Sequence, residues 1–451
     1  MDAEVKKLSA EELNKMGLVL MQAEQVEEAL KYFNRALEAD SEYLQSYYNK
    51  AMLYLVTEEY DEALACYDEI LCKDPKQGEA CYHKANLLFF YKENSKEAVE
   101  LYNKAICLGE KNEDIYYNLG LCMEASALNE EALKWVERAS RINEKRTDIL
   151  LKKSELLTSL KRYEEAIECY DQVLMIESDN EEAFHFKAIL LGETKRTEEA
   201  FTVLDKAAEI IGDKAIFEYD RALLYENQGQ YEEALSAVDK GLELDDRNTL
   251  LIVKKGSLLA MAGNYEGAKN VFDKVSEIEP ENVEGEFNKA SIHILLKEFE
   301  EADKLFEAIL QKCPDENPYK INSYYYKGLV LQGAGKSQEA KKAYETALTN
   351  YSVLSLTYTH DAQLMLLKAN TLRDLQRYQE AEELYEYVID LNKDMAEAHL
   401  MRAKNYIYLG KLKEGKKEID LALAINPAYK GIVEIDEELK RVFNSHEFGK
   451  V

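Results

Sequence analysis

The sequence has few of the residues that break helices. Only 5 of its 451 residues are Pro and 19 are Gly, which argues against a turn-rich all-β sandwich or barrel. It has no run of 18 apolar residues, so we expect no membrane insertion. Acidic residues stand near the N-terminus, where a signal peptide needs an apolar core. We therefore expect a helical protein of the cytoplasm.

Positive charge is also scarce. The chain has 57 Lys and Arg against 87 Asp and Glu, a formal net charge of −30. Binding to nucleic acid depends on Lys and Arg that neutralise phosphates, so we expect no direct contact with nucleic acid. The charge favours basic partners instead.

Recognisable chemistry is missing as well. The six His show no HExxH, and the sequence contains no GxxxxGK[ST], GxGxxG after a strand or GxSxG motif. The seven Cys form no CxxC pair, and their odd number excludes a complete set of internal disulfides. We expect free, mostly buried thiols. We predict no catalytic residue, no cofactor and no metal site, and a chain that is not an enzyme.

A repeated phrase dominates what is present. Variants of Glu-Glu-Ala-Leu recur along the chain, and every step from Ala98 to Ala302 is 34 residues. The central small residues are Ala29, Ala63, Ala98, Ala132, Ala166, Ala200, Ala234, Ala268, Ala302, Ala340, Ala381 and Gly415. A fixed period of this length indicates stacked structural repeats.

Each repeat contains two helical patterns. In residues 147–180, apolar residues recur at spacings of 3 and 4 in two stretches, separated by the polar pair Lys161 and Arg162. This spacing predicts two amphipathic helices folded back into an antiparallel hairpin. A small residue at the repeated Ala lets the two helices approach closely.

These features resemble the tetratricopeptide repeat family. The eighth residue of each repeat is small, namely Gly17, Ala51, Ala85, Gly120, Ser154, Ala188, Ala222, Gly256, Ala290, Gly328, Ala369 and Ala403. A large apolar residue follows sixteen or seventeen places later, as in Phe33, Tyr67, Tyr102, Tyr170, Phe272 and Tyr344. The resemblance implies about twelve repeats over residues 10–429, in an all-α, right-handed superhelical solenoid of antiparallel helix hairpins.

Three insertions interrupt the period. One extra residue lies within 89–94, four near 317–320 and seven within 352–361. We expect surface loops there, and the alternative is a hinge near 317–320 and 352–361. The predicted organisation is a leader (1–9), repeats 1–9 (10–316), repeats 10–12 (317–429), and a capping helix and tail (430–451).

The ends of the array carry their own signals. Ser9 and Glu12 match a capping box that opens the first helix. A solenoid also needs its last apolar face covered. Residues Ile432, Ile435, Leu439, Val442 and Phe443 predict one amphipathic capping helix, followed by a loose tail.

In the family, the first helix of each hairpin lines a concave surface through its second, fifth, sixth and ninth residues. Here those positions carry many aromatic and amide side chains. The candidate binding residues are Tyr48, Asn49, Tyr82, Tyr117, Asn118, Tyr219, Phe287, Asn288 and Tyr325. The amides are predicted to hold the backbone of a bound peptide. The alternative is that the tyrosines only brace neighbouring hairpins.

The second position of these helices is often acidic, as in Glu11, Glu79, Asp114, Asp148, Glu182, Glu284 and Glu397. Tyrosine rings with carboxylates at their rim favour a segment that bears Lys or Arg. We therefore expect a non-catalytic protein-binding adaptor or scaffold for a basic peptide or partner protein. The alternative is a structural subunit of a larger assembly or homo-oligomer that uses convex or edge surfaces.

One known function of the family is not expected. Co-chaperones that grip the acidic tails of heat-shock chaperones need Lys, Asn and Arg at defined positions of three consecutive repeats. Asn49 fits that carboxylate clamp, but Asn14 and Leu18 precede it, and Glu79 and His83 follow it. An acidic tail would be repelled there.

Overall fold

The computed structural model describes residues 8–314, 317–358 and 360–445, and these form an all-helical chain. The chain forms two compact units, Met1–Ile211 and Gly212–Val451. The boundary lies in the loop between the sixth and seventh hairpins. The predicted hinge near residues 317–320 and 352–361 concerns other places, inside the second unit, and stays a prediction.

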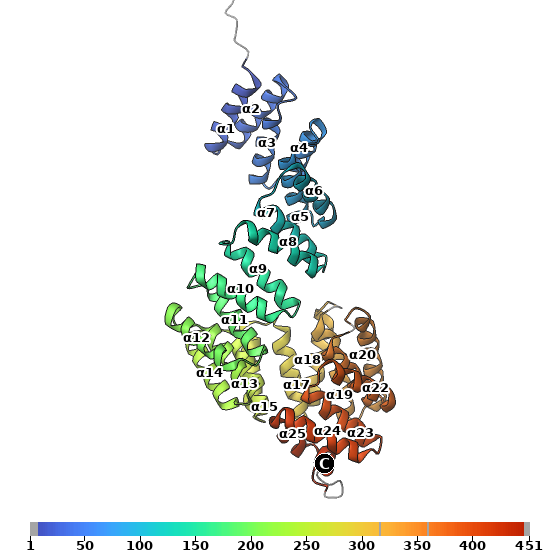
Figure 1. Cartoon of the computed structure of the whole chain (residues 1–451). Coiled ribbons are helices and arrows are strands. Elements are labelled where there is room, and N and C mark those ends of the chain that lie inside the picture. Colours follow the sequence, from blue (N-terminus) through green and yellow to red (C-terminus); the bar gives the residue numbers. More distant parts are fainter. Residues whose placement is uncertain (1–7, 315–316, 359, 446–451) are drawn as a thin grey trace, which may run out of the picture. The chain divides into compact units, whose positions relative to one another are not determined.

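The first unit contains six helical hairpins (Figure 1). Each first helix packs most extensively against the helix that follows it in the sequence. The helices are α1 (Ala10–Gln22), α2 (Val26–Ala39), α3 (Leu44–Val56), α4 (Tyr60–Lys73), α5 (Gly78–Phe90), α6 (Ser95–Leu108), α7 (Glu113–Ala125), α8 (Asn129–Ile142), α9 (Thr147–Ser159), α10 (Tyr163–Ile176), α11 (Glu181–Glu193) and α12 (Thr197–Ile211).

The second unit contains six more hairpins and a terminal helical segment. Its helices are α13 (Ala215–Asn227), α14 (Tyr231–Leu244), α15 (Thr249–Met261), α16 (Tyr265–Ile278), α17 (Val283–Leu295), α18 (Phe299–Lys312), α19 (Pro318–Gly333), α20 (Ser337–Thr357), α21 (Ala362–Asp374), α22 (Tyr378–Leu391), α23 (Ala396–Tyr408), α24 (Leu412–Ile425), η1 (Pro427–Tyr429), α25 (Lys430–Ile435) and α26 (Glu437–Phe443).

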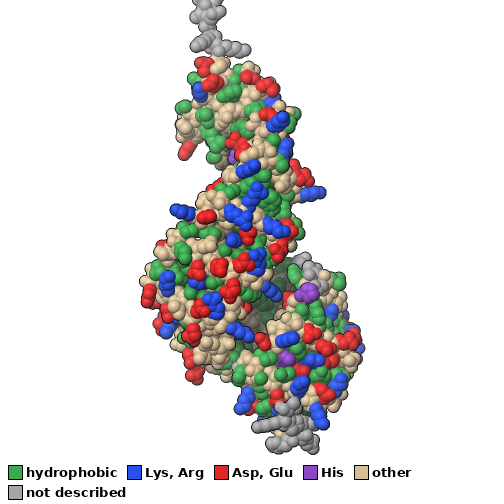
Figure 2. Space-filling view, viewed as in Figure 1, with side chains coloured by type: hydrophobic (Ala, Val, Ile, Leu, Met, Phe, Trp, Pro, Cys, Tyr) green, Lys and Arg blue, Asp and Glu red, His purple; other side chains and the backbone are tan. Residues whose placement is uncertain are grey.

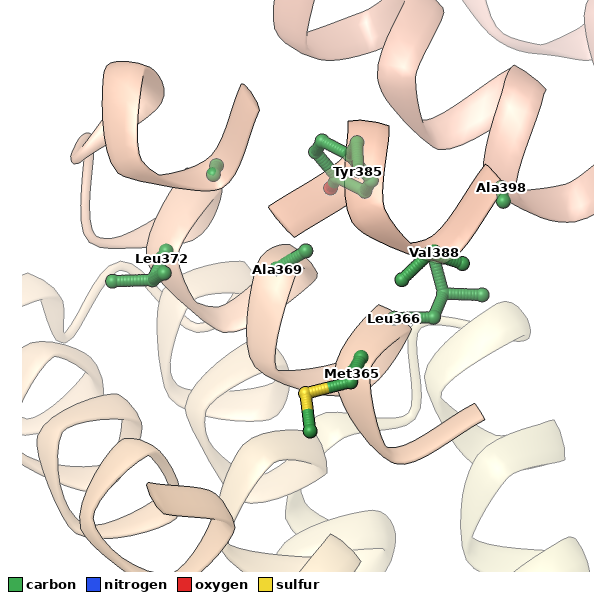
Figure 3. Packing of buried hydrophobic residues seen from close by; sticks show 8 residues of the cluster. Met365, Leu366, Ala369, Leu372, Tyr385, Val388 and Ala398 are labelled. Atoms are coloured by element: carbon green, nitrogen blue, oxygen red, sulfur yellow. The ribbon is translucent and has the colours of Figure 1, made fainter. Parts of the chain in front are cut away.

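The repeated small residue has the role that the sequence predicts. Ala29, Ala166 and Ala302 are completely buried between the two helices of their hairpins. Figure 3 shows the equivalent packing in the second unit, where Ala369 of α21 and Tyr385 of α22 lie in one apolar cluster. Such clusters recur from hairpin to hairpin, so the core is a series of small cores and not one centre.

Every hairpin turn contains one residue in the left-handed backbone conformation. Eight of these twelve residues are not glycine. They are Glu24, Glu58, Glu93, Ala127, Lys161, Lys195, Gly229, Gly263, Lys297, Gly335, Gln376 and Gly410. A left-handed residue ends the first helix and reverses the chain within three or four residues.

The insertions behave differently from one another. The extra residue near 89–94 lengthens the turn between α5 and α6, as predicted. The prediction of surface loops at the other two insertions is wrong. Asn317 caps α19, which begins at Pro318 and has 16 residues in place of the usual 13. The third insertion continues α20 to 21 residues, where α18 has 14.

Both ends of the described chain are defined by side chains. The Ser9–Glu12 capping box is present at α1. After the last hairpin, the predicted single capping helix is two short helices, because Asp436 ends α25 and caps α26. Val433, Leu439 and Val442 cover the last repeat, whereas Ile432 is exposed. The leader up to residue 7 and the tail from residue 446 lie outside the described residues.

Candidate binding face on the first helices

The candidate residues lie on the first helices of the hairpins. Several neighbouring first helices contact one another in each unit, for example α5 with α7 and α17 with α19, so their inward positions follow one another in a strip. The strip of the first unit carries Tyr48, Asn49, Tyr82, Tyr117 and Asn118. The strip of the second unit carries Tyr219, Phe287, Asn288 and Tyr325.

Tyr48 is half-buried and is held against its own hairpin. Its ring meets Tyr67 of α4 edge to face, with the centroids 6.2 Å apart. The hydroxyl is buried next to the Ala80 backbone without a well-formed hydrogen bond. Burial, followed by the negative charge of Glu79, raises the pKa of Tyr48 to about 12. The phenol therefore stays neutral, and its ring is a rigid apolar surface next to a carboxylate.

Tyr82 and His83 continue this strip on α5. The Tyr82 ring lies 5.1 Å from the His83 ring, and His83 stacks on Tyr67 at 5.8 Å. Burial lowers the pKa of His83, and Glu79, whose carboxylate lies 3.8 Å away, opposes this effect only in part. His83 is therefore neutral at pH 7 and leaves the charge of Glu79 uncompensated.

A second carboxylate lies close to this group. Glu110 acts on the pKa values of both Tyr48 and His83. Within the described part of the chain, neither Glu79 nor Glu110 forms an ion pair with Lys or Arg. We call Tyr48, Glu79, Tyr82, His83 and Glu110 the Tyr48–Tyr82 subsite.

The strip is different at Tyr117. The Arg146 guanidinium lies 5.7 Å from the Tyr117 ring centroid. It also pairs with Asp114 and with Asp148, the latter at 2.6 Å. Arg146 therefore already occupies the position that a ligand cation would take, and this part of the strip supplies its own countercharge.

The two asparagines are used within the fold. The Asn49 Nδ2 donates to Asn14 Oδ1 at 2.8 Å, and the Asn118 Nδ2 donates to Asn86 Oδ1 at 3.0 Å. Both amides are buried. They connect consecutive first helices, α1 with α3 and α5 with α7. One N–H of each amide is thus committed to the stack, so it is not available to a peptide backbone.

In the second unit, two of the predicted residues are core residues. Phe287 is 8% exposed and packs against Phe306 of α18 and Tyr326 of α19. Tyr325 is 6% exposed, and its hydroxyl donates to Asp374 Oδ2 at 2.9 Å. Both brace neighbouring hairpins, which is the alternative that the sequence left open.

Tyr219 and Asn288 remain half-buried on their helices. The Lys254 ammonium lies 5.8 Å from the Tyr219 ring centroid and pairs with Glu226 at 2.9 Å. Tyr219, like Tyr117, therefore has a cation from its own chain. Among the described residues, Asn288 has no corresponding contact with an aromatic ring or a cation.

Sequence reasoning missed the internal cations. Arg146 directly precedes α9, and Lys254 lies within α15; both positions were visible in the sequence, but only the structure shows which tyrosine each cation covers. Figure 2 shows acidic and basic side chains interspersed over the face in view. Basic side chains therefore balance part of the acidic excess locally. At the Tyr48–Tyr82 subsite, Glu79 and Glu110 are not balanced in this way.

Two further features are absent from the described residues. They contain no group of three or more His, Cys, Asp or Glu placed to hold a metal ion. None of their helices is both long and apolar enough to cross a lipid bilayer.

The stacked hairpins and their first-helix strips define an α-helical repeat protein. More specifically, the chain belongs to the tetratricopeptide repeat family. Models of this repeat match residues 14–79, 147–180, 219–248, 259–320, 325–390 and 366–430. Members of this family are protein-interaction scaffolds, and this chain is one.

Solved structures of similar chains span part or nearly all of its length. YrrB, described as a tetratricopeptide repeat protein with an unusual peptide-binding site, is 29% identical over 41% of this chain and 95% of its own, with a TM-score of 0.37. Yeast Tom70 is 17% identical over 97% of this chain and 99% of its own, with a TM-score of 0.44. The structure of Cut9 with Hcn1 is 15% identical over 96% of this chain and 96% of its own, with a TM-score of 0.43. No curated protein matches the chain.

Proposed function

We propose that the protein is a non-catalytic adaptor that binds a basic segment of a partner protein along the first-helix face of its first unit. The observation that carries this proposal is the Tyr48–Tyr82 subsite. The half-buried Tyr48 lies there near Glu79 and Glu110, and the half-buried Tyr82 ring follows beside His83. Glu79 and Glu110 have no Lys or Arg partner among the described residues. A Lys or Arg side chain of the partner supplies the missing charge.

The expected energy of each contact is modest. A cation over a tyrosine ring contributes about 0.5–2 kcal/mol, depending on how well water is excluded. Several such contacts add up because the packed hairpins hold the rings in place, so the receptor loses little conformational entropy on binding. We propose that Tyr117 extends the same strip, limited by Arg146, and that Asn49 and Asn118 support the strip from within by connecting consecutive first helices.

We also propose a reducing compartment, the cytoplasm. All seven Cys are free, and five of them are buried. Burial raises the pKa of Cys66 to about 11 and that of Cys122 to about 12. These thiols are therefore protonated at neutral pH and behave as small apolar side chains.

Affinity purification with mass spectrometry tests the adaptor role. The wild-type protein is compared with the Tyr48→Ala/Tyr82→Ala variant and with Tyr91→Ala, which removes an exposed tyrosine elsewhere in the same unit. We expect the double variant to lose one or more partners that the wild type and Tyr91→Ala retain. If the double variant keeps every partner, this face is not the binding site. An enzymatic activity that purifies with the chain would contradict the non-catalytic part.

A further inference from the structure

The second half of α20 is an unusual surface within the second unit. Its additional turns carry Val353 and Leu356, whose side chains are 63% and 80% exposed. Thr349 lies one turn before Val353 on the same exposed side. The helix therefore continues past the hairpin that it belongs to and presents an apolar stripe to solvent.

This stripe is also free of charge. Between Glu345 and Asp361 the sequence contains no Asp, Glu, Lys or Arg, although 32% of all residues in the chain are charged. An exposed helix normally carries charged residues on its outer face. Depletion of charge around exposed apolar residues is a property of the centre of a protein interface.

The stripe lies beside a hollow. One pocket of about 420 Å³ is lined by Leu348, Thr349, Ser352, Val353 and Leu356. A second pocket of about 420 Å³ extends from Leu348 and Ser352 to α21 and α22. Leu372, which Figure 3 shows at the edge of the α21 cluster, and Leu384 line this second pocket. Protruding apolar side chains and a hollow with mixed apolar and charged lining are thus neighbours on one surface.

The rim of the second pocket has two charges without a partner. Arg377 pairs with Glu380 at 2.7 Å. Lys368 and Glu383 also line the pocket, and neither forms an ion pair within the described chain; Lys368 donates only to Ser355 Oγ at 3.3 Å. An unpaired cation and an unpaired anion therefore lie on the same patch.

We propose that this patch is the interface of a homodimer, in which the α20 stripes of two copies pack against each other about a two-fold axis. Two-fold contact requires a self-complementary surface, and Leu356 of one copy beside the hollow of the other meets that requirement. The same rotation places Lys368 of each copy opposite Glu383 of its partner.

The two unpaired charges of the patch favour a second copy over another occupant, because each copy offers both Lys368 and Glu383. Two chains of net charge −30 repel each other over most of their surfaces, so self-association needs a contact without like charges, as the α20 stripe provides. A basic partner protein would instead bind the acidic surfaces of the chain and not this uncharged stripe. The stripe lies on a second helix and leaves the first-helix face open, so the dimer is independent of the proposed adaptor function.

Multi-angle light scattering and sedimentation equilibrium test the proposal with the full chain. We expect the wild type to be a dimer in the micromolar range and Leu356→Glu to weaken dimerisation by about 100-fold or more, because each dimer then buries two carboxylates. Met175→Glu is the matched control, since Met175 is 84% exposed on α10. It adds the same charge and should remain dimeric.

Two results would overturn the proposal: a monomeric wild type at all concentrations, including one that binds an apolar helix of another protein at α20, or a Leu356→Glu variant that is as dimeric as the control. Charge exchange gives a second test. Lys368→Glu and Glu383→Lys should each weaken the dimer, and the double variant should regain most of the loss. Additive losses in the double variant would contradict the two-fold arrangement.

Discussion

Gly256 of α15 lies directly beneath the ring of Phe272 of α16. A Cβ atom on Gly256 would lie 2.6 Å from the Phe272 Cζ, well inside van der Waals contact. Gly17 and Phe33 have the same relationship in the first hairpin, at 2.5 Å from Phe33 Cε1. The eighth residue of a repeat is therefore small because a large side chain of the second helix, in these two hairpins an aromatic ring, fills its space.

Gly256→Ala should destabilise the second unit by about 1–3 kcal/mol, because the methyl group displaces a packed ring. This is opposite to the usual effect of Gly→Ala within a helix, which is stabilising by about 1 kcal/mol. Gly431→Ala in α25 is the control, since a Cβ there meets nothing within 4 Å. Urea unfolding followed by circular dichroism measures both; a Gly256→Ala variant as stable as Gly431→Ala would contradict this packing.

The turn residue Lys161 has a φ of 59°, a conformation that disfavours side chains with a Cβ. Lys161→Gly should stabilise the first unit by about 0.5–1 kcal/mol, after the greater flexibility of glycine in the unfolded chain is subtracted. The converse change, Gly229→Ala at a φ of 74°, should destabilise the second unit by a similar amount. Thermal unfolding compares the two variants, and equal or reversed effects would show that the turns are not strained.

His399 should make the last hairpins more stable at lower pH. Its Nδ1 lies 2.6 Å from Glu418 Oε2, and this hydrogen bond is the main cause that raises the pKa of His399. The stabilisation is therefore complete below the unfolded value of about 6.5 and is lost as the pH rises through the higher folded value. Hydrogen exchange in α23 and α24, measured from pH 5.5 to 8.5, should show this dependence in the wild type. His399→Gln should remove it; an unchanged pH dependence would exclude this pair as its origin.

Arg146 should limit the binding of basic ligands at Tyr117. Arg146→Gln uncovers the ring and frees Asp114 and Asp148, so a Lys-rich peptide should bind about fivefold more tightly. Arg196→Gln is the matched control, because Arg196 pairs with Glu164 and Glu199 and no tyrosine contact is described for it. Fluorescence anisotropy at low salt, where surface charges are least screened, measures both affinities. Equal affinities of the two variants would contradict competition by Arg146.

The period of the sequence was sufficient to predict the hairpins. Buried residues such as Ala166 recur every 34 residues, and the spacing of apolar residues fixes each helix. It was not sufficient at the insertions. Residues after Ser352 continue α20, since they contain neither Pro nor Gly that would stop a helix. At the C-terminus, Asp436 accepts the backbone N–H groups of α26, and this cap divides the predicted single helix.

The candidate face was predictable in position but not in exposure. Tyr82 and Tyr325 occupy the same place in their repeats, yet Tyr82 is half-buried and Tyr325 is buried. Tyr325 is held from outside its own repeat, because its hydroxyl donates to Asp374, which is 49 residues away in the sequence. Likewise, Arg146, which directly precedes α9 of the next hairpin, covers Tyr117. Contacts between repeats are not encoded in the period, so the sequence alone did not show which rings stay open.

Site-specific photocrosslinking tests the binding face most directly. A photoreactive phenylalanine analogue replaces Tyr82 on a first helix in one variant and Met175 on a second helix of the same unit in another. We predict that a partner segment rich in Lys or Arg crosslinks from position 82 and not from position 175. Crosslinks from position 175 alone, or an acidic segment captured at position 82, would contradict the account.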